Sequence, residues 1–433
     1  MPRGRKHPSL AAPRAADADG QRVPAGGRMR ILRVTEQAVL GGEQTDVLHL
    51  LAQLDPARYE QTLCTEAAGP LVDEAARLGI PHIPMCMRSR FDLAAIRRLR
   101  DIVGAGRYDI VHLHGSRAGL LGRVAARLAR ARIVIWTMHV FQADVLEGWG
   151  RWQAPLYLLV EALLARWFCD HIITVSHDLR ERALRLESVP AHKVTTIYSH
   201  VALDCFGLAH NRAAKRMELG LSPDALVVCT VGRLCAQKGL PDFLQAAARV
   251  YAQLPEVRFL VVGDGPLRSG MEELAAKLGL TGCLEFTGYR SDVAEMMAAC
   301  DVFATATRWE GMGKVLVEAM AAGRPLVSTD VGPIPEIVRG YRGAILTPPR
   351  DPQAFAGALL TVLQHLPAYA RWADEDRAVA RARFGGQAMA QRTSALYEQL
   401  AAGRLPAARV AGLRRPGDAG GRGGEGSASQ QAP

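Results

Sequence analysis

The sequence predicts an α/β protein made of two Rossmann-like domains, each a doubly wound parallel sheet, that face each other across a cleft. At 433 residues the chain exceeds the size at which one hydrophobic core usually keeps growing, so two domains are expected. In both halves, short apolar segments typical of strands alternate with helical segments, which is the pattern of a parallel sheet covered on both faces. Such sheets bind ligands at the carboxyl ends of their strands, so we expect the functional residues in the loops that follow strands.

Composition limits the class of partner. The hydrophobic fraction of 49% and the aromatic fraction of 6% fit a globular protein. The net charge of +10 is concentrated at the two ends, because residues 1–28 carry six Lys or Arg against two Asp, and residues 404–433 carry five Arg against one Asp and one Glu. Residues 29–403, between the two ends, therefore carry little net charge. This does not favour nucleic-acid binding.

Both ends are predicted to be disordered tails, residues 1–28 because they lack periodicity and residues 404–433 because they are rich in Gly and Ser. No apolar run typical of a signal peptide precedes the first strand, and the longest apolar run, 154–164, contains Glu161 and is too short to span a bilayer. Eight cysteines without a C-x-x-C pair indicate free thiols in a reducing cytosol and no zinc site. We therefore expect a cytoplasmic protein.

The first domain is predicted over residues 29–206. It opens with an apolar strand at 30–35, then Gly41 and Gly42, then a helical pattern over 43–54. This order of strand, glycines and helix begins a Rossmann-like unit, although the two glycines could equally shape a simple turn. Further strands are expected at 61–65, 82–85, 110–114, 133–136, 171–175 and 193–198. Further helices are expected at 70–78, 91–104, 118–129 and 153–168.

A hinge or linker is predicted at 207–223, followed by the second domain over 224–380. A C-terminal helix over 381–403 is expected to pack back on the first domain. The second domain's strands are expected at 225–231, 258–262, 284–286 and 302–305. Its helices are expected at 242–253, 269–278, 292–298 and 314–322.

Two glutamates with two glycines between them mark the segment 309–338. The run from Lys314 to Ala322 favours helix, so Glu310 should lie in a loop and Glu318 on the helix. A loop that enters a helix N-terminus presents free backbone N–H groups, which suits an anion such as a diphosphate. A solvent-exposed glutamate pair before a core helix explains these residues equally well.

Charged and titratable residues also follow other predicted strands. Arg233 and Lys238 flank the loop after the first strand of the second domain, where two fixed cations can neutralise a diphosphate. A solvated pair of loop charges is the alternative. No Asp-x-Asp pair follows a strand, so no metal is implied. His139 is the best ligand candidate among three strand-end histidines, because its loop follows a strand of the predicted central sheet; His112 and His114 are the others.

With these motifs the chain resembles the retaining glycosyltransferases of family four, the group 1 glycosyltransferases, which have the GT-B fold. The resemblance runs from Met29 to Leu400, and its most specific part is the E-x7-E segment followed by EAMAAGRPLVSTDVGPIPEIV. The other matching stretches are VHLHGSRAGLLGRVAARLA at 111–129, ITVSHDLRERALRL at 172–186, VGRLCAQKGL at 231–240, VVGDGPLR at 261–268 and FTGYRSDV at 286–293.

The resemblance implies a role for each matching residue. Arg233 and Lys238 would hold the donor diphosphate and stabilise it as the leaving group. Glu310 and His139 would contact the donor sugar, and Glu318 the nucleotide ribose. The other implied donor-binding positions are Gly41, Gly42, Gly232, Tyr289, Arg290, Gly311, Met312, Gly313, Lys314 and Val315.

The implied activity is transfer of a sugar, with retention of its anomeric configuration, from a nucleotide-diphosphate sugar to a hydroxyl of a glycan, a lipid-linked or a small-molecule acceptor. The reaction would need neither metal nor other cofactor and would serve polysaccharide or glycolipid synthesis. In the front-face scheme written for this family, the departing phosphate helps to deprotonate the acceptor, so no protein nucleophile is required. Donor base, donor sugar, linkage and oligomeric state are left open by the sequence.

One departure from the family pattern keeps two alternatives open. Ser199-His200 stands where the family commonly has Asn-Gly, and His adopts a positive φ at a higher cost than Gly, so the turn should differ. A nucleotide-sugar 2-epimerase also uses two such domains, but it needs several acid/base residues at the sugar. A sugar-nucleotide-binding protein with impaired catalysis is the second alternative.

The acceptor side is predicted from the first domain's loops. Arg88-Ser89-Arg90 and Ser116-Arg117 suggest an anionic or lipid-diphosphate-linked acceptor and peripheral contact with the inner membrane surface. Solvated loops explain the same arginines.

Overall fold

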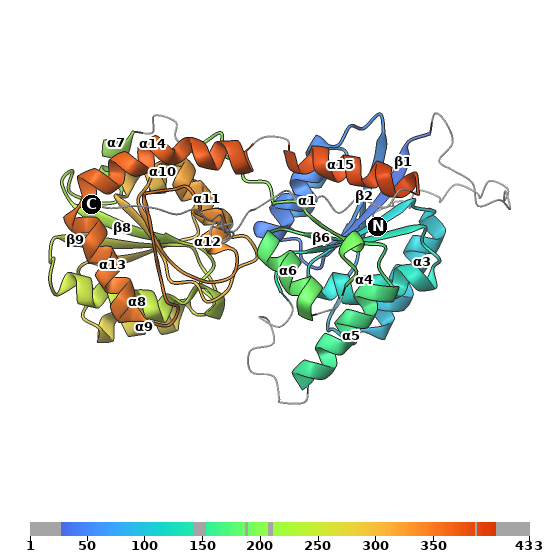
Figure 1. Cartoon of the computed structure of the whole chain (residues 1–433), viewed down its shortest axis with the longest axis horizontal. Helices are drawn as coiled ribbons and strands as arrows, with labels where there is room; N and C mark the ends of the chain where they lie inside the picture. Colours follow the sequence, from blue (N-terminus) through green and yellow to red (C-terminus); the bar gives the residue numbers. More distant parts are fainter. Residues whose placement is uncertain (1–26, 142–152, 187–188, 207–210, 386–387, 404–433) are drawn as a thin grey trace, which may run out of the picture.

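The computed structural model describes residues 27–141, 153–186, 189–206, 211–385 and 388–403, which form two α/β domains side by side (Figure 1). The predicted tails, apart from residues 27 and 28, lie outside the described residues, as do residues 207–210 of the predicted hinge.

The first domain is built on a seven-stranded parallel sheet of order β3-β2-β1-β4-β5-β6-β7. Its strands read as apolar and mostly buried runs because helices cover both faces. The strand order reverses between β1 and β4, which opens a crevice at their carboxyl ends. The strands are β1 Met29–Val34, β2 Tyr59–Thr65, β3 His82–Pro84, β4 Ile110–His114, β5 Ile133–Met138, β6 His171–Thr174 and β7 Val194–Thr196.

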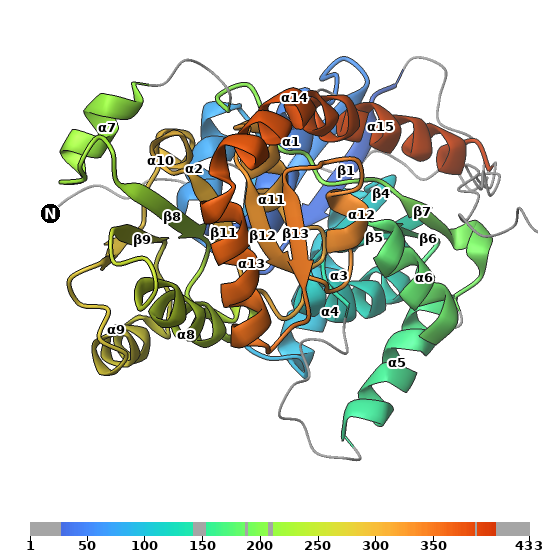
Figure 2. The ribbon, with the colours of Figure 1, turned by 60° about the vertical axis from the view of Figure 1, so that its left-hand side comes forward.

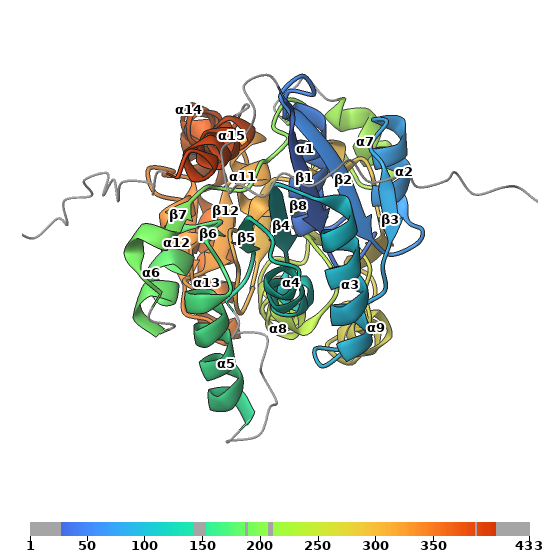
Figure 3. The same cartoon turned by 90° about the vertical axis from the view of Figure 1, so that its right-hand side faces the viewer.

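Two helical layers enclose this sheet, as Figure 3 shows. One layer contains α1 Gly42–Gln53, α2 Pro70–Arg77 and α15 Ala388–Ala401. The opposite layer contains α3 Leu93–Gly106, α4 Ser116–Leu128, α5 Gln153–Trp167 and α6 His177–Leu186.

The second domain repeats the architecture with a six-stranded parallel sheet of order β10-β9-β8-β11-β12-β13. Its order reverses between β8 and β11, so a second crevice lies at their carboxyl ends. The strands are β8 Leu226–Val231, β9 Val257–Val262, β10 Leu284–Gly288, β11 Val302–Thr305, β12 Leu326–Thr329 and β13 Ala344–Thr347.

Helices again cover both faces, as Figures 1 and 2 show. One side carries α7 Arg212–Glu218, α10 Val293–Ala299, α11 Lys314–Ala321 and α14 Leu366–Phe384. The other side carries α8 Leu240–Tyr251, α9 Arg268–Lys277 and α13 Pro352–Gln364, whose apolar side chains form a separate core. The short elements are α12 Ile334–Ile337 and the 3-10 turns Ala191–Lys193 and Ala236–Lys238.

The chain crosses between the domains a second time near its end. The helix predicted over 381–403 is in fact two, because residues 381–384 end α14 on the second domain, and α15 begins only at Ala388. The break follows Gly385, whose extended backbone (φ −84°, ψ 166°) ends α14. Tyr397 of α15 is fully buried in the first domain, where its hydroxyl lies 2.6 Å from Nδ1 of His112.

Within the described residues, no helix is long and apolar enough to cross a membrane. All eight cysteines are free thiols, and five of them are buried.

Candidate active site between the two domains

The loops at the two crevices face each other and touch. Gly311, in the loop after β11, lies against the backbone of His139, in the loop after β5. A Cβ atom at Gly311 would stand 1.6 Å from the carbonyl oxygen of His139, so no side chain fits there. Lys314 of the second domain likewise reaches the first-domain loop at Gly42, with its Nζ 2.7 Å from the Gly42 carbonyl oxygen. The two domains are therefore closed on each other at this point.

Glu310 is fixed from three directions by its own domain. Its Oε1 accepts from Nζ of Lys238 at 2.6 Å and from the Thr307 hydroxyl at 3.1 Å. Its Oε2 lies 3.3 Å from the amide nitrogen of Gln237. The residue is only 7% exposed. The predicted loop position of Glu310 is confirmed, and its carboxylate has a defined orientation before any ligand binds.

Arg233 and Lys238 share one loop but differ in their surroundings. Lys238 is engaged with Glu310, whereas Arg233 is exposed and its side chain meets no hydrogen-bond or ion-pair partner among the described residues. Gly239 lets this loop approach the next one, because it has φ +57° and a Cβ there would lie 2.0 Å from the carbonyl oxygen of Ala306. The loop after β8 thus offers one free cation and one tethered cation beside the loop after β11.

Glu318 lies on α11, as predicted, with Gly313 as the N-cap in the left-handed region (φ 79°). No described residue donates a hydrogen bond to its carboxylate. Burial raises the pKa of Glu318, and the charges of Lys314 and Lys238 partly oppose that rise. A shielded carboxylate without a protein donor is suited to accept hydrogen bonds from ligand hydroxyls.

The residues at the start of α11 contribute mainly through their backbone. The Met312 side chain is 4% exposed and packs in the large core, and Val315 is partly buried against the same core. No side chain caps the helix N-terminus, so its first N–H groups are available to an anion beside the loop.

Lys314 has a role that the sequence did not reveal. Besides the Gly42 carbonyl, its ammonium contacts Oγ1 of Thr45 at 2.8 Å and Oδ1 of Asp46 at 2.6 Å. The predicted donor-binding residue Lys314 is therefore also a link between the domains.

Asp46 is the centre of this interdomain contact, and the sequence interpretation missed it. Its side chain is fully buried, and its Oδ2 accepts from the Ser199 hydroxyl at 2.5 Å and lies 3.6 Å from Nδ1 of His139. The available pattern was weak: a single acidic residue directly before the apolar positions Val47 and Leu50 of a helix.

The three strand-end histidines differ in function. His112 uses both ring nitrogens inside the protein, toward Tyr397 and toward the Thr137 hydroxyl at 2.7 Å, so it is structural. His114 lies between the others, with its Nδ1 3.4 Å from Nε2 of His139. Burial lowers the pKa of His139 to about 4, with Asp46 opposing the fall, so its imidazole is neutral at pH 7.

Tyr289 and Arg290 follow β10 at the edge of the second sheet. Tyr289 is 74% exposed, so its ring is accessible to a ligand. The guanidinium of Arg290 is paired with Asp292 at 2.5 Å and with Glu218 at 2.7 Å. The guanidinium of Arg290 is thus already engaged. Contact between Arg290 and a nucleotide base stays a prediction, and we expect it to involve the backbone of Arg290 more than its guanidinium.

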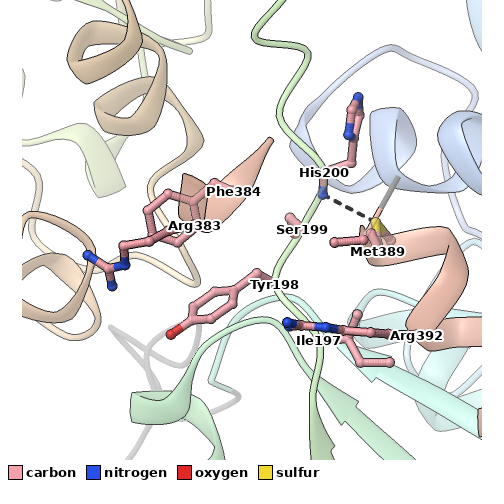
Figure 4. Close-up of a pocket in the computed structure, with 9 residues that line it drawn as sticks. Ile197, Tyr198, Ser199, His200, Arg383, Phe384, Met389 and Arg392 are labelled. Atoms are coloured by element: carbon pink, nitrogen blue, oxygen red, sulfur yellow. Dashed lines mark hydrogen bonds between the residues drawn. The ribbon is translucent and has the colours of Figure 1, made fainter. Parts of the chain in front are cut away.

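The unusual Ser199-His200 pair has an ordered setting at the first domain crossing (Figure 4). Neither residue has a positive φ, so the pair forms no left-handed turn. The His200 ring stacks on His49 of α1, with ring centroids 3.6 Å apart, and its backbone N–H points to the sulfur of Met389. A cavity of about 10 Å³, enough for one water molecule, lies here between the two domain crossings.

The predicted acceptor-side loop is also tied down. The guanidinium of Arg117 donates to the carbonyl oxygen of Met87 and lies 3.6 Å from the Glu36 carboxylate. Among the described residues, no group of three or more His, Cys, Asp or Glu side chains could hold a metal ion.

Both halves of the chain match known protein families. Residues 225–365 match the family described as glycosyl transferases group 1, and residues 41–200 match the glycosyl transferase 4-like domain. The chain is 28% identical over 343 residues to the UDP-Gal:alpha-D-GlcNAc-diphosphoundecaprenol alpha-1,3-galactosyltransferase of Escherichia coli, covering 77% of this chain and 88% of that protein. It is 28% identical over 389 residues to D-inositol 3-phosphate glycosyltransferase 2 of Catenulispora acidiphila, covering 83% and 90%.

A solved structure shares the architecture. The structure of Anabaena Alr3699/HepE in complex with UDP-glucose superposes with a TM-score of 0.75 at 23% sequence identity, covering 86% of this chain and 100% of that one. At this identity the likeness establishes the two-domain fold.

Proposed function

The chain belongs to the group 1 glycosyltransferases of the GT-B fold, and on this basis we propose that it transfers a sugar from a nucleotide-diphosphate sugar with retention of the anomeric configuration. The observation that carries the proposal is the convergence of Arg233, Lys238, Glu310 and the uncapped start of α11 at the crevice between β8 and β11. Two cations and free N–H groups beside an oriented carboxylate fit a diphosphate joined to a sugar.

Each residue has a distinct proposed task. Arg233, which has no described protein partner, binds the diphosphate directly, and Lys238 adds charge while it orients Glu310. Glu310 accepts hydrogen bonds from hydroxyls of the donor sugar. Glu318 accepts from the ribose, and the exposed Tyr289 ring lies near the nucleotide base.

The proposed step needs no nucleophile from the protein. The bond between the anomeric carbon and the diphosphate oxygen breaks, and the electron pair leaves with the nucleoside diphosphate. The acceptor hydroxyl oxygen bonds to the same face of the anomeric carbon, and its proton passes to a phosphate oxygen. Arg233 and Lys238 stabilise the charge that develops on the leaving group, and domain closure excludes competing water. Arg233 and Lys238 can stabilise the leaving group in this way without a metal ion.

His139 is proposed to act as a neutral group at the sugar. Its lowered pKa means that it does not supply a positive charge near an anomeric carbon that itself becomes positive. Its backbone carbonyl packs on Gly311 and thereby sets how deeply the donor sugar binds in the crevice.

A glycan or lipid-linked molecule is the proposed acceptor, in polysaccharide or glycolipid synthesis. The name of the Escherichia coli relative, which specifies a diphosphoundecaprenol-linked acceptor, supports this class. The same name makes UDP-galactose the first donor to test.

A thermal-shift screen against UDP-, GDP- and ADP-sugars identifies the donor base, because saturation at 100 times Kd should stabilise the protein by about 2.7 kcal/mol. Transfer with the selected donor is then followed on a panel of lipid-diphosphate sugars and free glycans, and NMR of the product gives the anomeric configuration. Inversion, or a sugar trapped covalently on the protein, would contradict the mechanism. A C2 epimer without transfer would indicate an epimerase, and binding without transfer or donor hydrolysis a binding protein. Both are disfavoured by the family.

A further inference from the structure

A cavity of about 320 Å³ opens at the amino ends of the strands of the second sheet, whereas the proposed donor crevice lies at their carboxyl ends. Asp301 directly precedes β11 and Pro325 directly precedes β12, so both lining residues mark this edge of the sheet. Helix α14 contributes Leu366 and Ala370 as an apolar wall. The cavity has the volume of a small-molecule site.

Two arginines from different elements meet in this cavity. Arg212, the first residue of α7, places its Nη1 2.8 Å from the carbonyl oxygen of Cys300. Arg324, which follows α11, places its Nη1 3.0 Å from the same oxygen. The two guanidiniums are therefore neighbours, and burial together with the charge of Arg212 lowers the pKa of Arg324. Two like charges at this separation repel each other, and an anion bound to both would remove the repulsion.

The acidic side chains of the lining do not balance these charges. Asp301 is shared between two arginines, because its Oδ1 lies 2.5 Å from Nη2 of Arg212 and its Oδ2 lies 2.7 Å from Nη2 of Arg216. Asp374, the other carboxylate of the lining, lies 3.3 Å from Nη1 of Arg377. Each carboxylate is thus already engaged by an arginine.

Arg324 is the less compensated of the two lining cations. It donates to the backbone carbonyl oxygens of Ala322 and Cys300, and it forms no ion pair with a described residue. Its Nη2 donates to none of the described residues. Arg212 and Arg216 each hold a carbonyl oxygen at the end of α10 at 2.9 Å, where a cation is favourable. Capping of α10 therefore accounts for Arg212 and Arg216 but leaves the charge of Arg324 uncompensated.

We propose that this cavity binds a small phosphate monoester, with the phosphate between Arg212 and Arg324 and the rest of the molecule against Leu366 and Ala370. A phosphate monoester carries a charge of about −1.5 to −2 at pH 7, so it can compensate both guanidiniums, whose planar forks match its oxygens. The exposed carboxylate of Asp374 can accept a hydrogen bond from a hydroxyl of the same ligand.

The site goes beyond the proposed function and does not depend on it. Helix α11 connects the two places, because it carries Glu318 at the donor crevice and is followed by Gly323 and Arg324 in the cavity lining. An occupant of the cavity would therefore contact the far end of a helix that is proposed to bind the donor. Figure 1 shows α7, α11 and α14 on the same side of the second domain.

Calorimetric titration of the full chain with glycerol 3-phosphate tests the site. Ala370→Phe should weaken binding at least tenfold, because the larger side chain fills the cavity while no charge or hydrogen-bonding group is removed. Ala378→Phe is the matched control, at an exposed position about two turns further along α14, and it should bind like the parent protein. Equal binding by the parent and Ala370→Phe, or no binding by the parent, would overturn the proposal.

Arginine variants distinguish this cavity from the donor crevice, which also suits a phosphate. Arg324→Gln should bind glycerol 3-phosphate at least tenfold more weakly. Arg371→Gln on the exposed side of α14 controls for the loss of a nearby charge, and Arg233→Ala removes a cation of the donor crevice; both should bind like the parent. Thermal midpoints show whether each variant is folded, and if Arg324→Gln is not, the Ala370→Phe pair decides. A loss of binding in Arg233→Ala with none in Arg324→Gln would place the phosphate in the donor crevice and refute the site. Because no donor or transfer is needed, this result is independent of the proposed function.

Discussion

Lys314 of the second domain holds the buried carboxylate of Asp46 in the first, with Nζ 2.6 Å from Oδ1. The same carboxylate binds Ser199 at the domain crossing and faces His139 beside the proposed donor sugar. One side chain therefore connects domain closure, the crossing and the active site.

Replacing this carboxylate should affect both stability and turnover. Asp46→Asn keeps the shape but leaves the Lys314 ammonium without its counter-charge, and removing one partner of a buried pair typically costs about 3 kcal/mol or more. We expect a lower unfolding midpoint and a fall in kcat/KM for transfer. Thr45→Ala is the control, because it removes only one neutral hydrogen bond to the same ammonium. Equal effects of the two variants would contradict a special role for Asp46.

Gly311→Ala should separate the domains at the active site. Its methyl group would overlap the His139 carbonyl oxygen, and the backbone on both sides cannot yield easily. We predict a larger radius of gyration in small-angle scattering and transfer reduced by at least tenfold. Gly357→Ala is the matched control. This glycine lies inside α13 with no atom within 4 Å of the added Cβ, so the change should stabilise by about 0.5–1 kcal/mol and leave transfer intact.

Arg233→Ala should lower the rate of transfer without lowering the stability of the fold. The side chain has no described protein partner, so the free energy of unfolding should change by less than about 0.5 kcal/mol. Loss of a cation from the leaving diphosphate should lower kcat by about 10²–10³-fold. Arg371→Ala on the exposed side of α14 is the control, and steady-state transfer assays compare the two. A variant with normal kcat would remove Arg233 from the mechanism.

Glu310→Gln should lower activity and also cost some stability. The sequence predicts only that Glu310 lies in a loop, and in the structure its carboxylate is buried and paired with Lys238. We expect a loss of about 1–3 kcal/mol in unfolding free energy and roughly 100-fold or more in kcat/KM. Urea titration and transfer assays measure the two effects. Full activity of this variant would refute the proposed site.

Stability should fall as the pH drops from 6.5 to 4. Burial lowers the pKa of His49, His139 and His171 to about 4, so in this window the unfolded chain binds protons that the folded chain refuses. Each contributes up to about 1.4 kcal/mol per pH unit. Glu43 acts in the opposite sense, because burial raises its pKa to about 7 and the folded state keeps its proton. Glu318 acts in the same sense as Glu43, because burial raises its pKa too. The three histidines, joined by His112 and His114, whose pKa values burial also lowers, outweigh these two glutamates. Thermal midpoints of His171→Gln between pH 4 and 7 should vary less steeply than those of the parent.

The parallel-sheet architecture was predictable because local patterns determine it. Strands β4 and β11 begin and end at the predicted residues, and Glu310 and Glu318 occupy the predicted loop and helix, since apolar runs and glycine breaks are properties of the neighbouring sequence. The prediction of two domains depended only on the renewed alternation of strand and helix segments in the second half of the chain.

The interdomain contacts were not predictable in the same way. Asp46 and Lys314 are 268 residues apart, and nothing near either residue indicates the other. The ordered setting of Ser199-His200 depends on Asp46 and His49, which lie three residues apart on α1 and meet the crossing only in the folded chain. The sequence does carry a signal for the break between α14 and α15, the glycine pair at 385–386, which the prediction of a single helix overlooked.

The small cavity beside Ser199 is lined by both domain crossings, Ile197–His200 from the first and Arg383, Phe384 and Met389 from the second. Two covalent connections that run side by side act as a hinge. The domains can open about this hinge, but a twist or a translation of one domain against the other strains both connections at once. The motion of one domain relative to the other is thereby reduced to a rotation about one hinge axis. Each opening to admit a donor then brings Gly311 back to the same contact with His139, without a search for alignment.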